Sequence, residues 1–86
     1  MSRAEIELRI LREEISETRR AFLRFASSQH EWAGECRARG DDAGMRERCA
    51  VRDTYRRSAQ NISIALARVT RRMRTENCIA TQEVKA

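Results

Sequence analysis

The chain has 86 residues, a length that holds at most one domain, and its 18 Lys and Arg against 13 Asp and Glu give a formal net charge of +5. It contains three Gly and no Pro, which argues against sandwiches and barrels, because folds with many strands need many turns. No segment approaches the ~18 consecutive apolar residues of a membrane span, and residues 1–5 lack the apolar region of a signal peptide, so we expect a cytoplasmic protein with no membrane segment.

A long first helix is predicted over residues 2–37. Steps of three and four along this segment meet apolar residues at all but two positions, which is a heptad pattern. The members of this pattern are Ala4, Leu8, Leu11, Ile15, Thr18, Phe22, Phe25, Gln29, Trp32 and Cys36. Ser2 is a candidate N-cap, because Glu5 follows three residues later, which is the spacing of a capping box.

The only dense cluster of helix breakers lies at residues 38–44 and predicts a turn. Asp41 or Asp42 is placed to cap a second helix, which we expect over about residues 45–75. The heptad pattern of this helix runs through Arg52, Tyr55, Ala59, Ile62, Leu66, Val69 and Met73. The pattern then ends, and residues 77–86 are predicted to form a flexible tail.

Two such helices joined by a short turn predict an all-α fold, a long antiparallel hairpin that packs like a coiled coil. With the turn centred near residue 41, residues whose numbers sum to about 82 lie level. A lone hairpin of this size buries little surface, so we expect a dimeric four-helix bundle or a higher oligomer. Four apolar residues off the heptad pattern are candidates for an oligomer or partner interface: Ile6, Ile10, Leu23 and Ile64.

Basic residues are concentrated in the second half of the chain. Residues 1–36 hold 6 Arg and 7 Glu, whereas residues 37–86 hold 12 bases and 6 acids. Near the end of the second helix, four arginines lie level with four glutamates of the first helix, and we expect ordinary solvated ion pairs between them. These residues are Arg68, Arg71, Arg72 and Arg74, level with Glu14, Glu13, Glu7 and Glu5.

A basic band with aromatic neighbours is predicted around the middle of the hairpin, where acids are few. Arginines bind phosphate groups, and flat groups such as bases stack on aromatic rings. The candidate ligand-binding residues are Arg20, Arg24, His30, Trp32, Arg52, Tyr55 and Arg56. The alternative interpretation is that Trp32 and Tyr55 pack between the helices as members of the heptad pattern.

Three cysteines are an odd number for a disulfide framework. Cys36 and Cys49 lie level across the hairpin, so they form either a disulfide or two reduced thiols, whereas Cys78 is expected to be free. No close cysteine pair and only one histidine are present, so no metal site is predicted. The sequence patterns of phosphate-binding loops, nucleophile elbows and zinc helices are absent, so we expect neither a cofactor nor an enzymatic activity.

Three functions remain open. The first is an oligomeric hairpin whose arginines and aromatic rings bind or sequester an anionic ligand such as a nucleotide signal. The second is an inhibitor or adaptor that binds a host protein through its helical surface, and the third is a nucleic-acid binder, whose affinity falls steeply with salt. In size and architecture the chain is similar to small accessory proteins of phages and mobile elements, among them helical-hairpin inhibitors of bacterial defence systems. This resemblance implies a non-enzymatic anti-defence inhibitor.

Overall fold

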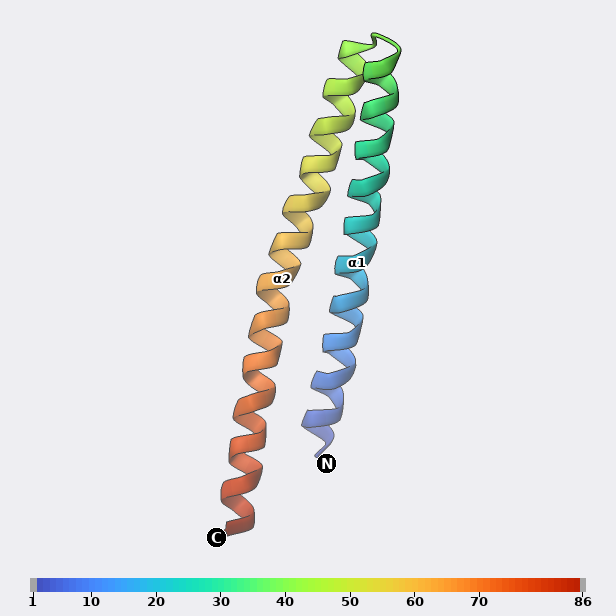
Figure 1. The fold of residues 1–86 in the computed structure, drawn as a ribbon. Coiled ribbons are helices and arrows are strands. Elements are labelled where there is room, and N and C mark those ends of the chain that lie inside the picture. The colour runs from blue at the N-terminus through green and yellow to red at the C-terminus, as the bar shows by residue number, and fades with distance from the viewer. Residues whose placement is uncertain (1, 86) are drawn as a thin grey trace.

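The computed structural model describes residues 2–85, and the side chains of residues 2–75 and of Cys78. This part of the chain forms two helices, α1 (Arg3–Ala38) and α2 (Asp42–Lys85), which run antiparallel and side by side (Figure 1). The molecule is a rod with extents of 70 × 15 × 12 Å. The all-α hairpin that the heptad patterns predict is therefore confirmed.

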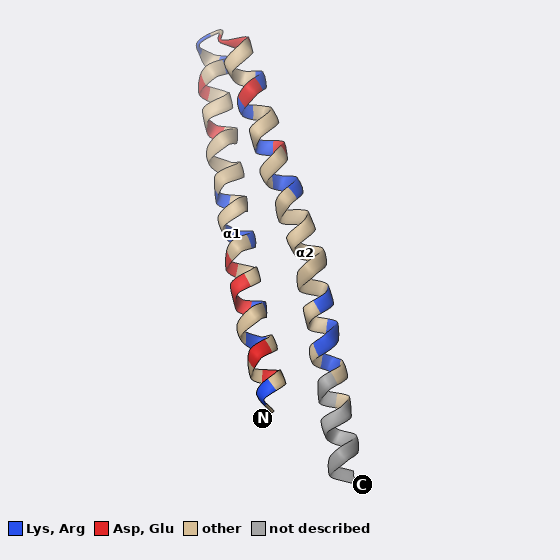
Figure 2. Cartoon of the chain, turned by 180° about the vertical axis from the view of Figure 1, so that it is seen from behind, with Lys and Arg blue, Asp and Glu red and all other residues tan. Residues whose placement is uncertain are grey.

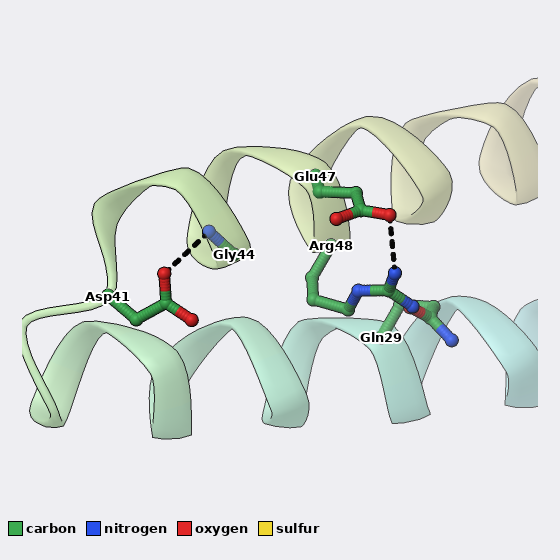
Figure 3. Close-up of polar contacts among 5 residues, drawn as sticks. All are labelled: Gln29, Asp41, Gly44, Glu47 and Arg48. Atoms are coloured by element: carbon green, nitrogen blue, oxygen red, sulfur yellow. Dashed lines mark hydrogen bonds and ion pairs between the residues drawn. The ribbon is translucent and has the colours of Figure 1, made fainter.

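A turn of three residues, 39–41, joins the two helices. Gly40 has a φ of +76°, in the left-handed region that side chains with a Cβ disfavour, and the N–H groups of Gly40 and Asp41 donate to carbonyls of the last turn of α1 in a Schellman motif. The carboxylate of Asp41 accepts a hydrogen bond from the Gly44 N–H at 2.9 Å, so Asp41 is the N-cap of α2 (Figure 3). Because Asp41 closes one helix and starts the next, the turn is shorter than the predicted 38–44.

The start of α1 agrees with the sequence prediction, whereas the bounds of α2 differ from it. Ser2 Oγ accepts a hydrogen bond from the Glu5 N–H at 3.2 Å, so Ser2 is the N-cap of α1, as predicted. Helix α2 begins at Asp42, earlier than predicted, and continues to Lys85. The segment 77–85, predicted as a flexible tail, is therefore helical. No Gly or Pro follows the turn region, so nothing in the sequence ends the helix where its apolar pattern ends.

Small side chains line the contact between the helices. The buried residues of the described part are Ala26, Ala33, Cys36 and Ala59, each at most 4% exposed. No side chain larger than that of cysteine is buried among the described residues. The helices are therefore close together along a narrow line, and the hairpin by itself lacks the core of large side chains that stabilises most small domains.

Half of the predicted heptad pattern of α1 lies on this contact line, and half lies beside it. On the line are Leu8, Ile15, Phe22, Gln29 and Cys36, which are buried or half-buried. Leu11, Phe25 and Trp32 are instead 42%, 51% and 47% exposed, and Ala26 and Ala33 take the contact positions. The physical reason is size, because two alanines let the helix backbones approach, whereas large rings fit only beside the line of closest approach.

The register between the helices agrees with the prediction. Arg19 Nε donates to Ser63 Oγ at 2.7 Å, and Arg52 Nη1 lies 2.9 Å from His30 Nδ1. The residue numbers of both pairs sum to 82, the value expected for a turn centred near residue 41. The vertical alignment of the helices was thus correctly predicted, and the difference lies in the rotation of α1 about its own axis.

Candidate functional site

The predicted ligand-binding residues are divided between two sides of the hairpin. His30 and Trp32 are two residues apart on α1, a rotation of about 200° on an α-helix, so they lie on opposite sides of the contact with α2. One side carries a groove that we call the polar groove, lined by His30, Ala33, Gly34, Arg37, Met45, Cys49 and Arg52. The other side carries Trp32 together with exposed Leu11 and Phe25.

Arg52 joins the two helices in the polar groove. Its Nη1 donates to His30 Nδ1 at 2.9 Å, and its Nε donates to Asp53 Oδ1 at 3.0 Å. Because arginine has only donors, His30 Nδ1 is the acceptor, and the ring proton of a neutral His30 lies on Nε2. The Arg52 side chain is only 19% exposed. His30 and Arg52 are thus the two predicted ligand-binding residues that the fold brings into direct contact.

The polar groove has a volume of about 200 Å³. Pockets for small organic ligands are usually ~300–1,000 Å³, so this groove is closer in size to an inorganic anion than to a whole nucleotide. Two arginines, Arg37 and Arg52, and His30 line it. Chemically, the groove offers hydrogen-bond donors to a small anion, with Gly34 leaving one part of its wall without a side chain.

On the opposite side, Trp32 contacts an arginine that the sequence analysis did not select. The Arg48 guanidinium carbon lies 4.2 Å from the centroid of the Trp32 ring, a cation–π arrangement. Arg48 also donates to Gln29 Oε1 at 3.0 Å and to Glu47 Oε1 at 2.9 Å (Figure 3). The available signal was the register, because the residue numbers of Trp32 and Arg48 sum to 80, close to the value for residues that lie level across the hairpin.

Tyr55 packs against phenylalanines of α1. Its ring centroid lies 5.9 Å from that of Phe22 and 5.5 Å from that of Phe25. The two phenylalanine rings meet edge to face with a centroid distance of 6.4 Å. The alternative interpretation is therefore confirmed for Tyr55, which packs between the helices, whereas Trp32 stays about half exposed.

The other three predicted arginines are exposed and are not gathered around this site. Arg20 lines a separate groove together with Arg9, Arg12 and Met73, further towards the open end of the hairpin. Arg24 and Arg56 form no ion pair within the described part of the chain. These three arginines therefore lie apart from the contact between Arg52 and His30, and their role in binding a ligand stays a prediction.

The predicted ion pairs between the helices are absent from the described residues. Acidic residues gather on α1 towards its N-terminus and basic residues along α2 (Figure 2). The ion pairs of the described part, Arg3–Glu7, Arg48–Glu47 and Arg52–Asp53, each lie within one helix. Arg68, Arg71, Arg72 and Arg74 are all exposed. These arginines lie level with glutamates of α1 but, within the described residues, form no ion pairs with them, because the arginine side chains are on the exposed surface of α2.

Apolar residues, interrupted by Thr18 and Ser58, follow the Trp32 side of the rod. On α1, exposed Leu11, Phe25 and Trp32 share a seven-residue spacing with Thr18, so they form one line along the helix. A groove of about 260 Å³ begins there, lined by Leu11, Glu14, Ile15, Thr18, Ile62 and Ala65. We call the apolar face the following residues: Leu11, Thr18, Phe25 and Trp32 of α1, and Val51, Tyr55, Ser58, Ile62 and Ala65 of α2.

The four residues predicted as an oligomer or partner interface are exposed, but they do not share one face. Ile6, Ile10, Leu23 and Ile64 are 46%, 52%, 37% and 51% exposed. Leu23 precedes His30 by one heptad, so it lies on the side of the polar groove, away from the apolar face. The apolar face was missed because its α1 residues had been assigned to the contact between the two helices.

The cysteines and the remaining surface contain no further reactive centre within the described residues. Cys36, Cys49 and Cys78 are free, so the reduced alternative describes the first two. In the described part of the chain, no three His, Cys, Asp or Glu side chains are grouped to hold a metal ion. Neither helix, as far as it is described, is long and apolar enough to cross a membrane.

Comparisons with protein-family models, with curated proteins and with solved structures found no match to this chain. The functional argument therefore depends on the geometry of the two sides of the hairpin, the polar groove and the apolar face.

Proposed function

We propose that this protein is a helical interaction module that binds another helical surface through its apolar face. The observation that carries the proposal is the line of Leu11, Phe25 and Trp32, which keeps the seven-residue spacing of a coiled coil and stays 42%, 51% and 47% exposed in the single hairpin. The α2 residues Tyr55 and Arg48 cover only part of Phe25 and Trp32. Single exposed apolar residues are ordinary on protein surfaces, whereas a heptad line of large ones is typical of an interface.

The energetics support a partner on this face. Full burial of a Leu, Phe or similar side chain contributes about 1.5–3 kcal/mol, so covering the exposed half of each contributes about 1 kcal/mol per residue. For Leu11, Phe25 and Trp32 together this is about 3 kcal/mol, a large fraction of the stability of a small domain. Binding through this face would therefore stabilise the hairpin while forming the complex.

A photo-crosslinking amino acid at position 25 tests the proposal, with position 64 as the matched control. Phe25 and Ile64 are both 51% exposed, but only Phe25 belongs to the apolar face. With benzoylphenylalanine in place of each residue, we expect ultraviolet light to produce a discrete covalent adduct from position 25 and none from position 64. Equal labelling from both positions, or no adduct from position 25, would contradict the proposal.

Anion binding in the polar groove is a second candidate function. The observation that favours it is the convergence of Arg37, Arg52 and His30 on one groove of about 200 Å³. Calorimetric titration with inorganic phosphate and with a nucleotide panel would test it. We expect Arg37→Ala to weaken phosphate binding and Arg46→Ala, an exposed arginine outside the groove, to leave it unchanged.

A further inference from the structure

We infer that the occupant of the apolar face is a second copy of this chain, placed alongside the first with its turn at the same end. The two hairpins then form a four-helix bundle whose two-fold axis runs parallel to the rod. In this arrangement α1 of each copy lies antiparallel to α2 of the other, at the same register as within the hairpin. The inference rests on the proposed function and adds the identity and orientation of the partner.

The single chain exposes more surface than a compact monomer of the same mass, and the excess is large enough for a dimer interface. The chain exposes 6696 Å². A compact monomer of 10.0 kDa exposes about 5,200 Å² by the scaling of surface with mass. The excess of about 1,500 Å² is larger than the ~800 Å² that each partner buries in a standard interface. A second copy on the apolar face would bury area that the narrow contact between α1 and α2 leaves exposed.

The side chains of the apolar face are complementary to those of a second copy in this orientation. The α1 line and the α2 line of the face both repeat every seven residues, so they stay aligned along the bundle. Phe25 lies level with Ser58 of the partner subunit, and Trp32 lies level with Val51 of the partner subunit. Large rings then pack against small or short side chains, the combination that fills a helical core without voids.

The charges that border the face select the same orientation. Glu14 lines the apolar groove, and Glu7 precedes it by one heptad. On α2, Arg68 and Arg72 follow Ala65, another lining residue, by three and seven positions. With the turns at the same end, Glu14 lies level with Arg68 of the partner subunit, and Glu7 lies within about one turn of the level of Arg72 of the partner subunit. The ion pairs that the hairpin does not form within itself are then formed between two copies.

The opposite orientation lacks this complementarity. With the turns at opposite ends, α1 packs antiparallel against α1 of the other copy. When Leu11 of one copy lies level with Trp32 of the partner subunit, Glu7 lies level with Glu35 of the partner subunit. Like charges at the border of an interface oppose association. The charge pattern therefore favours the arrangement with both turns at one end.

A matched pair of substitutions tests whether the second copy occupies the face. We expect Phe25→Glu to weaken self-association by on the order of a hundredfold, because a carboxylate replaces a central aromatic contact. Ile64→Glu introduces the same charge at a residue of equal exposure, 51%, outside the face, and is expected to leave the dimer intact. Equal effects of the two substitutions on the mass in solution would overturn the inference.

A charge exchange tests the orientation with variants that leave the apolar residues unchanged. Glu14→Arg and Arg68→Glu each place like charges across both borders of their own homodimer, and we expect each to self-associate about tenfold more weakly than the natural chain. Mixing the two variants pairs opposite charges at both borders, so the heterodimer is expected to regain the original affinity. A mixture as weak as its components would overturn the arrangement with both turns at one end.

The mass in solution and the crosslink from position 25 together distinguish a failure of this inference from a failure of the proposed function on which it rests. A natural chain that stays monomeric while position 25 crosslinks to a different protein would overturn self-association and leave the interaction module intact. Absence of both self-association and any crosslink from position 25 would overturn both proposals. A crosslinked product with twice the mass of the chain supports both.

Discussion

The two sides of the hairpin are built by the same pair of helices and differ in how completely their side chains are paired. On the polar side, Arg52 contacts His30 and Arg19 contacts Ser63 across the helices, at 2.9 and 2.7 Å. On the apolar side, Phe25 and Trp32 remain about half exposed. A polar side chain can find water or a neighbour, whereas an exposed heptad line gains most from another helix. This difference is the reason why we propose a partner for the apolar side and not for the polar side.

A substitution on the contact line between the helices, which both sides share, is expected to change the free energy of unfolding most. Ala59 is 3% exposed at the closest approach of the helices, so Ala59→Leu forces them apart and is expected to lower the free energy of unfolding by about 1–3 kcal/mol. Ala67→Leu, at an exposed position of the same helix, is the matched control. Urea denaturation followed by circular dichroism compares them, and equal midpoints would contradict the assignment of Ala59 to the contact line.

The two glycines Gly40 and Gly34 are expected to respond to alanine with opposite signs. Gly40 has a φ of +76°, so Gly40→Ala is expected to destabilise the chain by about 1 kcal/mol. Gly34 lies within α1, and a Cβ there meets no atom within 4 Å, so Gly34→Ala is expected to stabilise by about 0.5–1 kcal/mol. Thermal unfolding of the two variants measures both changes. A stabilising Gly40→Ala would be inconsistent with the turn described above.

Arg48 and Arg52, two of the arginines whose side chains bond across the helices, allow a direct comparison of the two sides. Arg48 stacks on Trp32 and bonds to Gln29 on the apolar side, so Arg48→Ala is expected to cost about 1 kcal/mol of unfolding free energy. Arg52→Ala removes one hydrogen bond to His30 and an ion pair to a half-exposed aspartate, and about 0.5 kcal/mol is expected. The fluorescence of Trp32, the only tryptophan, should change with the first substitution and stay constant with the second. The reverse pattern would contradict the division of these residues between two sides.

The sequence predicted the features that depend on local chemistry. Ser2 was identifiable as the cap of α1, and the cap of α2 was limited to Asp41 or Asp42, because a short polar side chain before a helix satisfies its free N–H groups. The register followed from the position of the breakers. The end of α2 was placed too early, because the apolar pattern reports where packing ends and not where the helix ends.

The rotation of α1 was not predictable from the heptad pattern, and the candidate site depended on it. Both Phe25 with Trp32 and Ala26 with Ala33 continue the pattern of Phe22 in steps of three and four. Hydrophobicity favoured the large rings, whereas close packing of two helices favours the alanines. This choice moved the aromatic residues from the contact line to the exposed face, separated Trp32 from His30, and placed Arg48 beside Trp32.

The most direct test of a second copy on the apolar face is the mass of the natural chain in solution, measured by sedimentation equilibrium over a range of concentrations. We predict a monomer–dimer equilibrium that reaches twice the chain mass of 10.0 kDa, with helicity that rises as the dimer forms. A chain that stays at 10.0 kDa at every concentration, with its helicity unchanged, would contradict the account.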